Sequence, residues 1–196
     1  TINGDTAFGS CTTSKFFQGF KVAQKRRLER AIELLPKIGA EFETSFGRPG
    51  LAYFDESGFP EDGRVDLAVV GLGPDFGTYE SLRETWEKES GLTTAGIALR
   101  LITPFPRKAI AERLAGAKAV LVVNHAHHHG RGHFTLDIVD ALSDLPNPPR
   151  VVSAFAGMGG ADVGESTWER MLDLGKDAVA GKKVPESVVF HEGVTV

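Results

Sequence analysis

The sequence contains a single cysteine, Cys11, among its 196 residues. One thiol cannot form a disulfide within the chain, and it cannot supply the several thiolates that hold an iron–sulfur cluster. Disulfide-stapled secreted domains are therefore excluded. The low cysteine content fits a reducing compartment and predicts a cytoplasmic protein.

Long apolar runs and an excess of basic residues are also missing. No stretch approaches the roughly 20 apolar residues that a membrane-spanning helix needs, so membrane insertion is not expected. The formal net charge is −4, whereas a nucleic-acid-binding surface needs clustered basic residues. The one basic run, Lys25 to Arg27, is followed by Glu29 and Glu33, a pattern typical of a solvated helix face.

Familiar catalytic motifs are absent as well. The sequence has no nucleophile elbow, no Walker loop and no dependable combination of His, Asp and Ser. We therefore predict no catalytic residue in this chain and expect the chain alone to be inactive.

The sequence does contain a regular alternation of strand and helix patterns. Strands are predicted at residues 65–70, 97–102, 118–123 and 150–155, and helices at 79–88, 107–114, 134–142 and 166–180. This rhythm indicates βαβ units. The predicted fold is α/β: a three-layer, mostly parallel sheet with helices on both faces. We assign residues 64–184 to this domain and 185–196 to a C-terminal tail with a candidate edge strand at 187–190.

An N-terminal helical arm is predicted upstream of this domain. Residues 1–13 are small and polar, as in a linker, and apolar residues from Phe17 to Phe42 then recur at helical spacings. They predict one helix over residues 14–46, with Pro36 as a possible kink or break. Residues 1–63 are therefore assigned to a linker and arm. Because the first residue is Thr1, we expect a piece of a longer polypeptide.

The loop Gly71–Gly77 follows the first predicted strand, which is the place for a phosphate-binding loop. Its G-x-G-x-x-x-G spacing departs from the dinucleotide motif, and Pro74 removes one backbone donor. A tight turn into a helix capped by Asp75 or Thr78 is favoured. A second Gly-rich exit, Gly157 to Asp162, permits close backbone approach or is simply a turn.

Histidines gather after the third predicted strand, at positions 125, 127, 128, 129 and 133. Imidazoles bind zinc, but a structural zinc site needs about four fixed ligands, and Arg131 would repel a cation. We predict no metal site here. A pH-sensitive contact loop, or a lining for an acidic ligand, fits equally well. The alternative function is an independent Rossmann-like module that binds a nucleotide at Gly71–Gly77 or a metal at His125–His133.

Arg100 is a cation within the predicted apolar strand 97–102. A charge in such a place must find a partner or lie at the mouth of the strand. One interpretation is an ion pair with a core carboxylate such as Asp137 or Asp66. The other is that Arg100 faces a carboxylate or phosphate of a ligand at the edge of the sheet.

Three sequence motifs follow one another along the chain: Arg100-Leu-Ile-Thr-Pro-Phe-Pro106, then Val-Leu-Val-Val-Asn124-His125, then Gly157-Met-Gly-Gly160. The set resembles the second core domain of the pyruvate (2-oxoacid):ferredoxin oxidoreductase alpha subunit, a domain of the transketolase C-terminal type. Phe8-Gly-Ser10 and Phe46-Gly-Arg48 resemble the family's connecting arm. His125-Ala-His-His-His129 replaces the family's usual charged phrase after the third strand.

The resemblance implies an intact enzyme that oxidatively decarboxylates a 2-oxoacid such as pyruvate, usually to acyl-CoA. The complex would use thiamine diphosphate with Mg, iron–sulfur clusters and coenzyme A, with ferredoxin as electron acceptor. This chain would bind none of them alone. It would pack against the thiamine-diphosphate-binding domains or subunits and wall the active site. The candidate substrate or interface residues are Arg100, Thr103, Phe105, Asn124, His125, His129 and Arg131.

Overall fold

The computed structural model describes residues 14–50, 52–128 and 130–190. The chain forms two compact units, one before Ala52 and one from Ala52 onward. The first contains a single long helix, α1 (Ser14–Phe46), whose predicted bounds are confirmed and which is not divided at Pro36. In the described part of the chain, no helix has the length and apolar character needed to cross a membrane.

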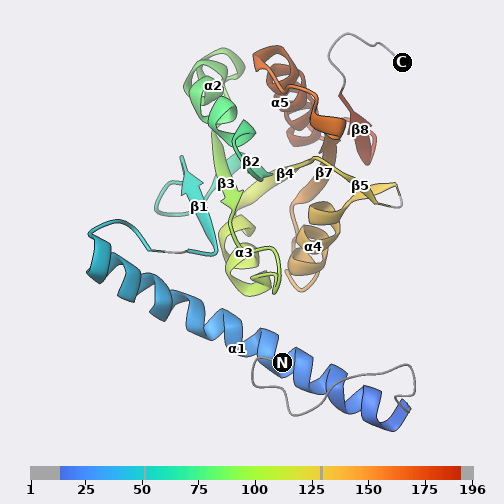
Figure 1. The fold of residues 1–196 in the computed structure, drawn as a ribbon. Coiled ribbons are helices and arrows are strands. Elements are labelled where there is room, and N and C mark those ends of the chain that lie inside the picture. The colour runs from blue at the N-terminus through green and yellow to red at the C-terminus, as the bar shows by residue number, and fades with distance from the viewer. Residues whose placement is uncertain (1–13, 51, 129, 191–196) are drawn as a thin grey trace. The chain divides into compact units, whose positions relative to one another are not determined.

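The second unit is built on a six-stranded sheet (Figure 1). Its strands are β1 (Phe54–Ser57), β2 (Val65–Gly71), β3 (Thr94–Leu99), β4 (Ala117–Asn124), β7 (Arg150–Phe155) and β8 (Ser187–Val189). The order across the sheet is β1-β3-β2-β4-β7-β8. All neighbours run parallel except β1, which pairs antiparallel with β3. The predicted mostly parallel sheet and its edge strand near residue 187 are therefore confirmed.

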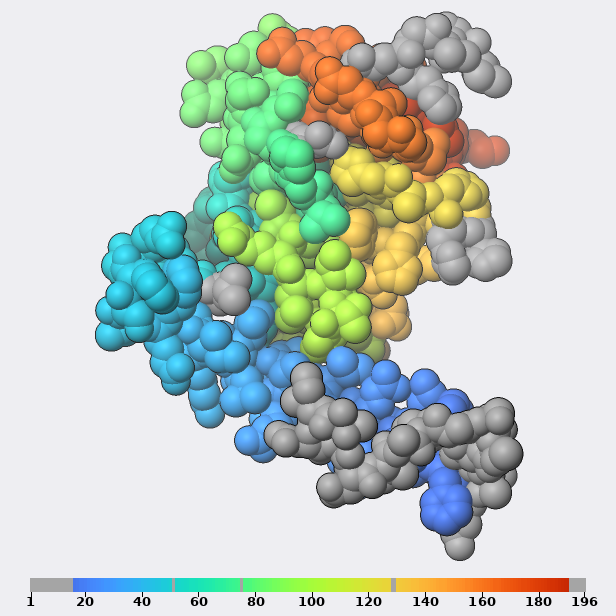
Figure 2. Space-filling view, viewed as in Figure 1, coloured from blue at the N-terminus to red at the C-terminus, as the bar shows by residue number. Residues whose placement is uncertain are grey.

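Helices cover both faces of the sheet, as the α/β prediction requires. They are α2 (Asp75–Ser90), α3 (Arg107–Leu114), α4 (His133–Leu142) and α5 (Glu165–Val179). The helices α2 and α5 pack on one face, where Tyr79, Trp168 and Met171 are buried against Leu67 and Leu121. Figure 2 shows these two helices side by side, in green and orange.

The opposite face of the sheet is covered by α3 and α4 (Figure 1). Ile110 and Leu114 of α3 and Ile138 of α4 are fully buried there against Val120 and Val122 of β4. Because β4 is buried on both faces, its sequence reads as a continuous apolar run rather than an alternating one.

The second parallel strand lies three residues earlier than predicted, at Thr94–Leu99 instead of 97–102. It begins with small residues because Phe76 and Tyr79 of α2 pack directly over Gly96, where a Cβ would lie 2.3 Å from Phe76 Cζ. The strand ends at Leu99 because the next two amides, of Arg100 and Leu101, both donate to the Tyr53 carbonyl oxygen.

The edge strand β1 lies in the stretch that the sequence assigns to the arm, so residues 52–63 belong to the sheet unit instead. Its sequence Phe54-Asp-Glu-Ser57 has only half-buried and exposed positions, and no apolar alternation marks it as a strand. Ion pairs join it to its neighbours: Asp55 pairs with Arg100, just after β3, and Glu56 pairs with Arg113 of α3.

Asp66 ties together the amino ends of three strands. Its carboxylate lies 2.6 Å from Lys118 Nζ and accepts hydrogen bonds from the Thr93 amide and hydroxyl. Burial alone would raise the pKa of Asp66, but these donors outweigh it and hold the pKa below its ordinary value.

We expect Asp66→Asn to lower the free energy of unfolding in a pH-dependent way. Since the folded pKa lies below the unfolded value of about 3.9, the stabilisation by Asp66 is present above that value and disappears as the pH falls through the folded pKa. Urea unfolding of both proteins between about pH 7 and pH 2 measures the difference. Asp173→Asn, on an exposed part of α5, is the control, and a deficit that grows toward low pH would contradict this account.

Candidate functional site

The chain changes direction across the sheet between β2 and β4. From β2 it passes through α2 to β3 on one side, whereas from β4 it passes through α4 to β7 on the other. Ligands of open α/β sheets bind in the crevice at the carboxyl ends of the strands at such a point. The candidate site is therefore the edge of the sheet around Leu72 and His125.

His125 occupies this place with its own side chain. Its Nδ1 lies 3.0 Å from the Ala156 carbonyl oxygen, and its Nε2 lies 3.3 Å from the Leu72 carbonyl oxygen. The half-buried ring thus bridges the exits of β7 and β2 from the end of β4. Gly157 makes room for it, because a Cβ at that position would lie 2.9 Å from Nδ1.

Asn124, the neighbouring candidate, is not at the surface. It is 1% exposed, and its Nδ2 lies 2.9 Å from Thr135 Oγ1 and 3.2 Å from Ser153 Oγ. The two hydroxyls are themselves 2.9 Å apart. The strand β4 continues through this residue and turns its side chain toward α4 and β7. Asn124 stays a prediction as a substrate or interface residue.

Gly132 closes the other side of this polar cluster. A Cβ at Gly132 would lie 1.9 Å from Asn124 Cγ and Oδ1, so only glycine leaves room for the amide. Asn124 Oδ1 has no hydrogen-bond partner among the described residues. The cluster of Asn124, Thr135 and Ser153 joins β4, α4 and β7 in the core.

The two candidate arginines make ion pairs within the unit. Arg100 lies just after β3, and its Nε is 2.6 Å from Asp55 Oδ2, with half of its side chain exposed. The predicted partners Asp137 and Asp66 are therefore wrong. The cause is the earlier position of the strand, which ends at Leu99 and so places Arg100 outside the buried run and next to β1. Arg131 pairs with Glu186, just before β8.

The remaining candidates lie at the exit of β3 or outside the described residues. Thr103 is exposed and precedes Pro104 through a cis peptide bond. Phe105 is half-buried and packs against the core on the α3 and α4 side. His129 is outside the described residues. The described candidates therefore spread along the edge of the sheet: Arg100, Thr103 and Phe105 follow β3, whereas Asn124 and His125 lie at the end of β4.

The alternative function rests on the loop Gly71–Gly77 and on the histidines of residues 125–133. The loop Gly71–Gly77 is a tight turn, as predicted. The helix after it has Pro74 at its N-cap with no side-chain cap, so capping by Thr78 is wrong, and the Asp75 side chain is outside what the structure describes. Within residues 14–50, 52–128 and 130–190, no three His, Cys, Asp or Glu side chains are placed to hold a metal ion. Nucleotide and metal binding both stay predictions.

Sequence reasoning missed the partners that define this edge. Ser153 is a single hydroxyl within the apolar strand β7, and Thr135 stands in the first turn of α4. A buried polar residue needs a partner, so a lone serine in an apolar run was a usable signal. Glu186 and Asp55 lie far from their arginines in sequence, and nothing local marks them.

We expect His125→Ala to lower the stability of the second unit by about 1–2 kcal/mol, since it removes a half-buried ring that lies within hydrogen-bond distance of the Ala156 and Leu72 carbonyl oxygens. His127→Ala is the matched control: that ring is exposed and only stacks on Phe155, with centroids 4.9 Å apart. Urea unfolding of the two variants checks this. An equal or larger loss in His127→Ala would contradict the bridging role of His125.

Residues 65–167, from β2 into the first turn of α5, match the family model described as pyruvate:ferredoxin oxidoreductase core domain II. The chain is 27% identical to pyruvate synthase subunit PorA of Thermotoga maritima over 85% of its length and 41% of the relative's. It is 26% identical to ketoisovalerate oxidoreductase subunit VorA of Pyrococcus horikoshii, over 94% of its length and 46% of the relative's. The chain thus spans less than half the length of these relatives.

Among solved structures, the chain is similar to a 2-oxoglutarate:ferredoxin oxidoreductase from Magnetococcus marinus with 2-oxoglutarate, coenzyme A and succinyl-CoA bound. The TM-score is 0.45 and the identity 13%, over 69% of this chain and 21% of that one. A split-gene transketolase, an inactive beta4 tetramer, gives a TM-score of 0.44 and 19% identity, over 68% and 46%. The family match covers more than half of the sequence, and the chain belongs to the pyruvate:ferredoxin oxidoreductase core domain II family.

Proposed function

We propose that this chain is the second core domain of a 2-oxoacid:ferredoxin oxidoreductase and acts there as a non-catalytic domain for assembly. The enzyme would decarboxylate a 2-oxoacid oxidatively and pass the electrons to ferredoxin in the cytoplasm. The observation that carries the proposal is the family match over residues 65–167, which takes in the four central parallel strands β2, β3, β4 and β7.

The bonding at the edge of the sheet supports a structural role. Arg100 and Arg131 pair with carboxylates of the same chain, and the two ring nitrogens of His125 lie within hydrogen-bond distance of two backbone carbonyl oxygens. Each of these contacts fixes one loop to another. The polar side chains at the strand exits therefore hold the edge in one shape, which suits a wall or an interface.

The same bonding bears on the cofactors of the family. Thiamine diphosphate and coenzyme A are polyanions, and their sites need available cations or backbone donors. The two candidate arginines are engaged with carboxylates of the same chain, which does not favour such a site at this edge of the sheet. We therefore assign thiamine diphosphate, Mg, the iron–sulfur clusters and coenzyme A to other domains of the enzyme, and we derive no step through them here.

An activity measurement on the intact oxidoreductase tests the proposal. The purified enzyme, loaded with its cofactors, is given pyruvate, 2-oxoisovalerate or 2-oxoglutarate, and ferredoxin reduction is followed. We expect turnover with at least one of them and none with residues 1–196 alone. Turnover by residues 1–196 alone, or by neither preparation, would overturn the proposal.

A further inference from the structure

One face of α1 carries large apolar side chains along its whole length. Phe17, Leu28, Leu35 and Phe46 follow one another at spacings of 11, 7 and 11 residues, which correspond to three, two and three helical turns. They therefore lie in line over about 44 Å, at 1.5 Å per residue. Phe17 is 50% exposed and Phe46 63% exposed.

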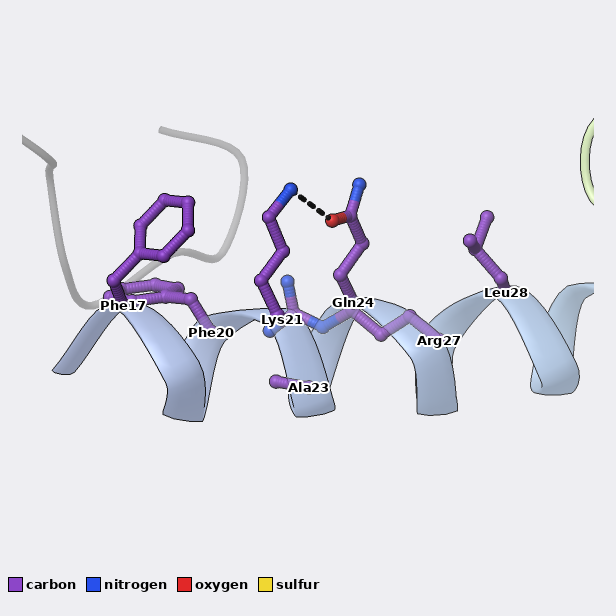
Figure 3. Close-up of a pocket in the computed structure, with 7 residues that line it drawn as sticks. All are labelled: Phe17, Phe20, Lys21, Ala23, Gln24, Arg27 and Leu28. Carbon is purple, nitrogen blue, oxygen red and sulfur yellow. Dashed lines mark hydrogen bonds between the residues drawn. The ribbon is translucent and has the colours of Figure 1, made fainter. Parts of the chain in front are cut away.

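The amino-terminal part of this face lines one side of a hollow, and Figure 3 shows the lining residues. The hollow has a volume of about 400 Å³, and all the described residues that line it come from α1. Phe17, Lys21, Gln24 and Leu28 project to the same side of the helix, with Lys21 Nζ 3.2 Å from Gln24 Oε1. Arg27 also lines the hollow, and no carboxylate is among the described lining residues.

The net charge on this part of the helix is positive. Residues 14–30 contain six Lys and Arg and one Glu, which gives a net charge of +5, whereas residues 31–46 contain one Lys and three Glu, which gives −2. A surface of apolar side chains flanked by Lys and Arg is complementary to an apolar segment that carries carboxylates. A small anion would use the cations but not the apolar line, which continues for many residues beyond the hollow.

A single helix cannot bury its own apolar face, and in proteins most helical stability comes from packing that face against a partner. The relatives are more than twice as long as this chain, so they contain polypeptide with no counterpart here. We infer that the hollowed face of α1 is a docking surface for an acidic, amphipathic segment of the oxidoreductase outside residues 1–196. This inference rests on the proposed function, because it takes its partner from the same enzyme.

Site-specific photo-crosslinking in the intact enzyme tests the inference. A photoreactive phenylalanine analogue replaces Phe17, and the adduct is located by mass spectrometry. We expect a crosslink to a segment rich in Asp or Glu outside residues 1–196. The same analogue at Val22, which is 53% exposed and lies about 140° around the helix from Phe17, should give at least tenfold less of that adduct.

A charge reversal tests the electrostatic part. Arg27→Glu should lower the yield of the Phe17 adduct on the order of tenfold, which equals about 1.4 kcal/mol in binding. Arg26→Glu makes the same change on the neighbouring residue, outside the hollow, and should leave the yield unchanged. Equal loss in both variants, or an adduct to lipid, to a second α1 or to no segment at all, would overturn the inference. Ferredoxin reduction by the Phe17-substituted enzyme separates the docking inference from the proposed function. Turnover without the adduct would overturn the docking surface and leave the proposed function standing.

Discussion

Replacing Gly132 with alanine is expected to destabilise the α/β unit by about 3 kcal/mol or more, because overpacking of a rigid polar core is costly. The new Cβ would lie 1.9 Å from Asn124 Cγ, and Asn124 is 1% exposed and bonded to Thr135 and Ser153, so its side chain has nowhere to move. The backbone dihedral angles of Gly132 are ordinary for any residue, so the effect comes from space alone. Chemical denaturation followed by circular dichroism measures it.

Two further variants make this prediction specific. Gly77→Ala, in the first turn of α2, introduces a Cβ with nothing within 4 Å and should be neutral or slightly stabilising. In an Asn124→Ala background the steric conflict is gone, so Gly132→Ala should then cost less than about 1 kcal/mol. An unchanged cost in that background would show that the Asn124 contact is not the cause.

Truncation of Trp168 to alanine should cost about 3–5 kcal/mol, the usual range for a large buried aromatic residue. Trp168 is 1% exposed and packs on Tyr79 of α2, with ring centroids 5.6 Å apart, so its removal leaves a cavity between α2, α5 and the sheet. The midpoint and slope of a urea unfolding curve give the loss in the free energy of unfolding.

Trp168→Phe separates the packing of the ring from its polar atom. Trp168 Nε1 is buried and has no hydrogen-bond partner among the described residues. Phenylalanine removes that unsatisfied donor while it keeps most of the packing, so the loss should be smaller than in Trp168→Ala by roughly 2 kcal/mol. Equal losses in the two variants would mean that Nε1 bonds to a water molecule that matters for stability.

The parts of the fold that the sequence predicted well are those buried on both faces. The apolar runs of β2, β4 and β7 are compatible only with buried strands. The bounds of the exposed helix α1 were predicted from its helical spacing of apolar residues instead. The strand β3 was misplaced because its first half, Thr94-Ala-Gly96, is small rather than apolar, and its size is set by Phe76 and Tyr79 of another element. The strand β1 was missed because pairing with β3 and two ion pairs hold it.

The sequence predicted where the candidate residues lie along the chain, but not which residues they contact. The order of elements pointed to the strand exits near Arg100 and Asn124–His125, and His125 does lie at the change of direction between β2 and β4. Whether a candidate side chain faces solvent depends on contacts with residues that are distant in sequence. Ser153 lies 29 residues from Asn124 and Glu186 lies 55 residues from Arg131, and no local pattern reveals such pairs.

The central claim is that this domain supports the oxidoreductase without taking part in its chemistry. The most direct test is the turnover number per assembled complex of the intact enzyme that carries His125→Ala, with the assembled fraction measured separately by size-exclusion chromatography. We predict a lower assembled fraction and a kcat per assembled complex within about twofold of the unmodified enzyme, since no interaction made only in the transition state is lost. A kcat reduced by about a hundredfold in normally assembled complexes would contradict the claim and make His125 part of the reaction.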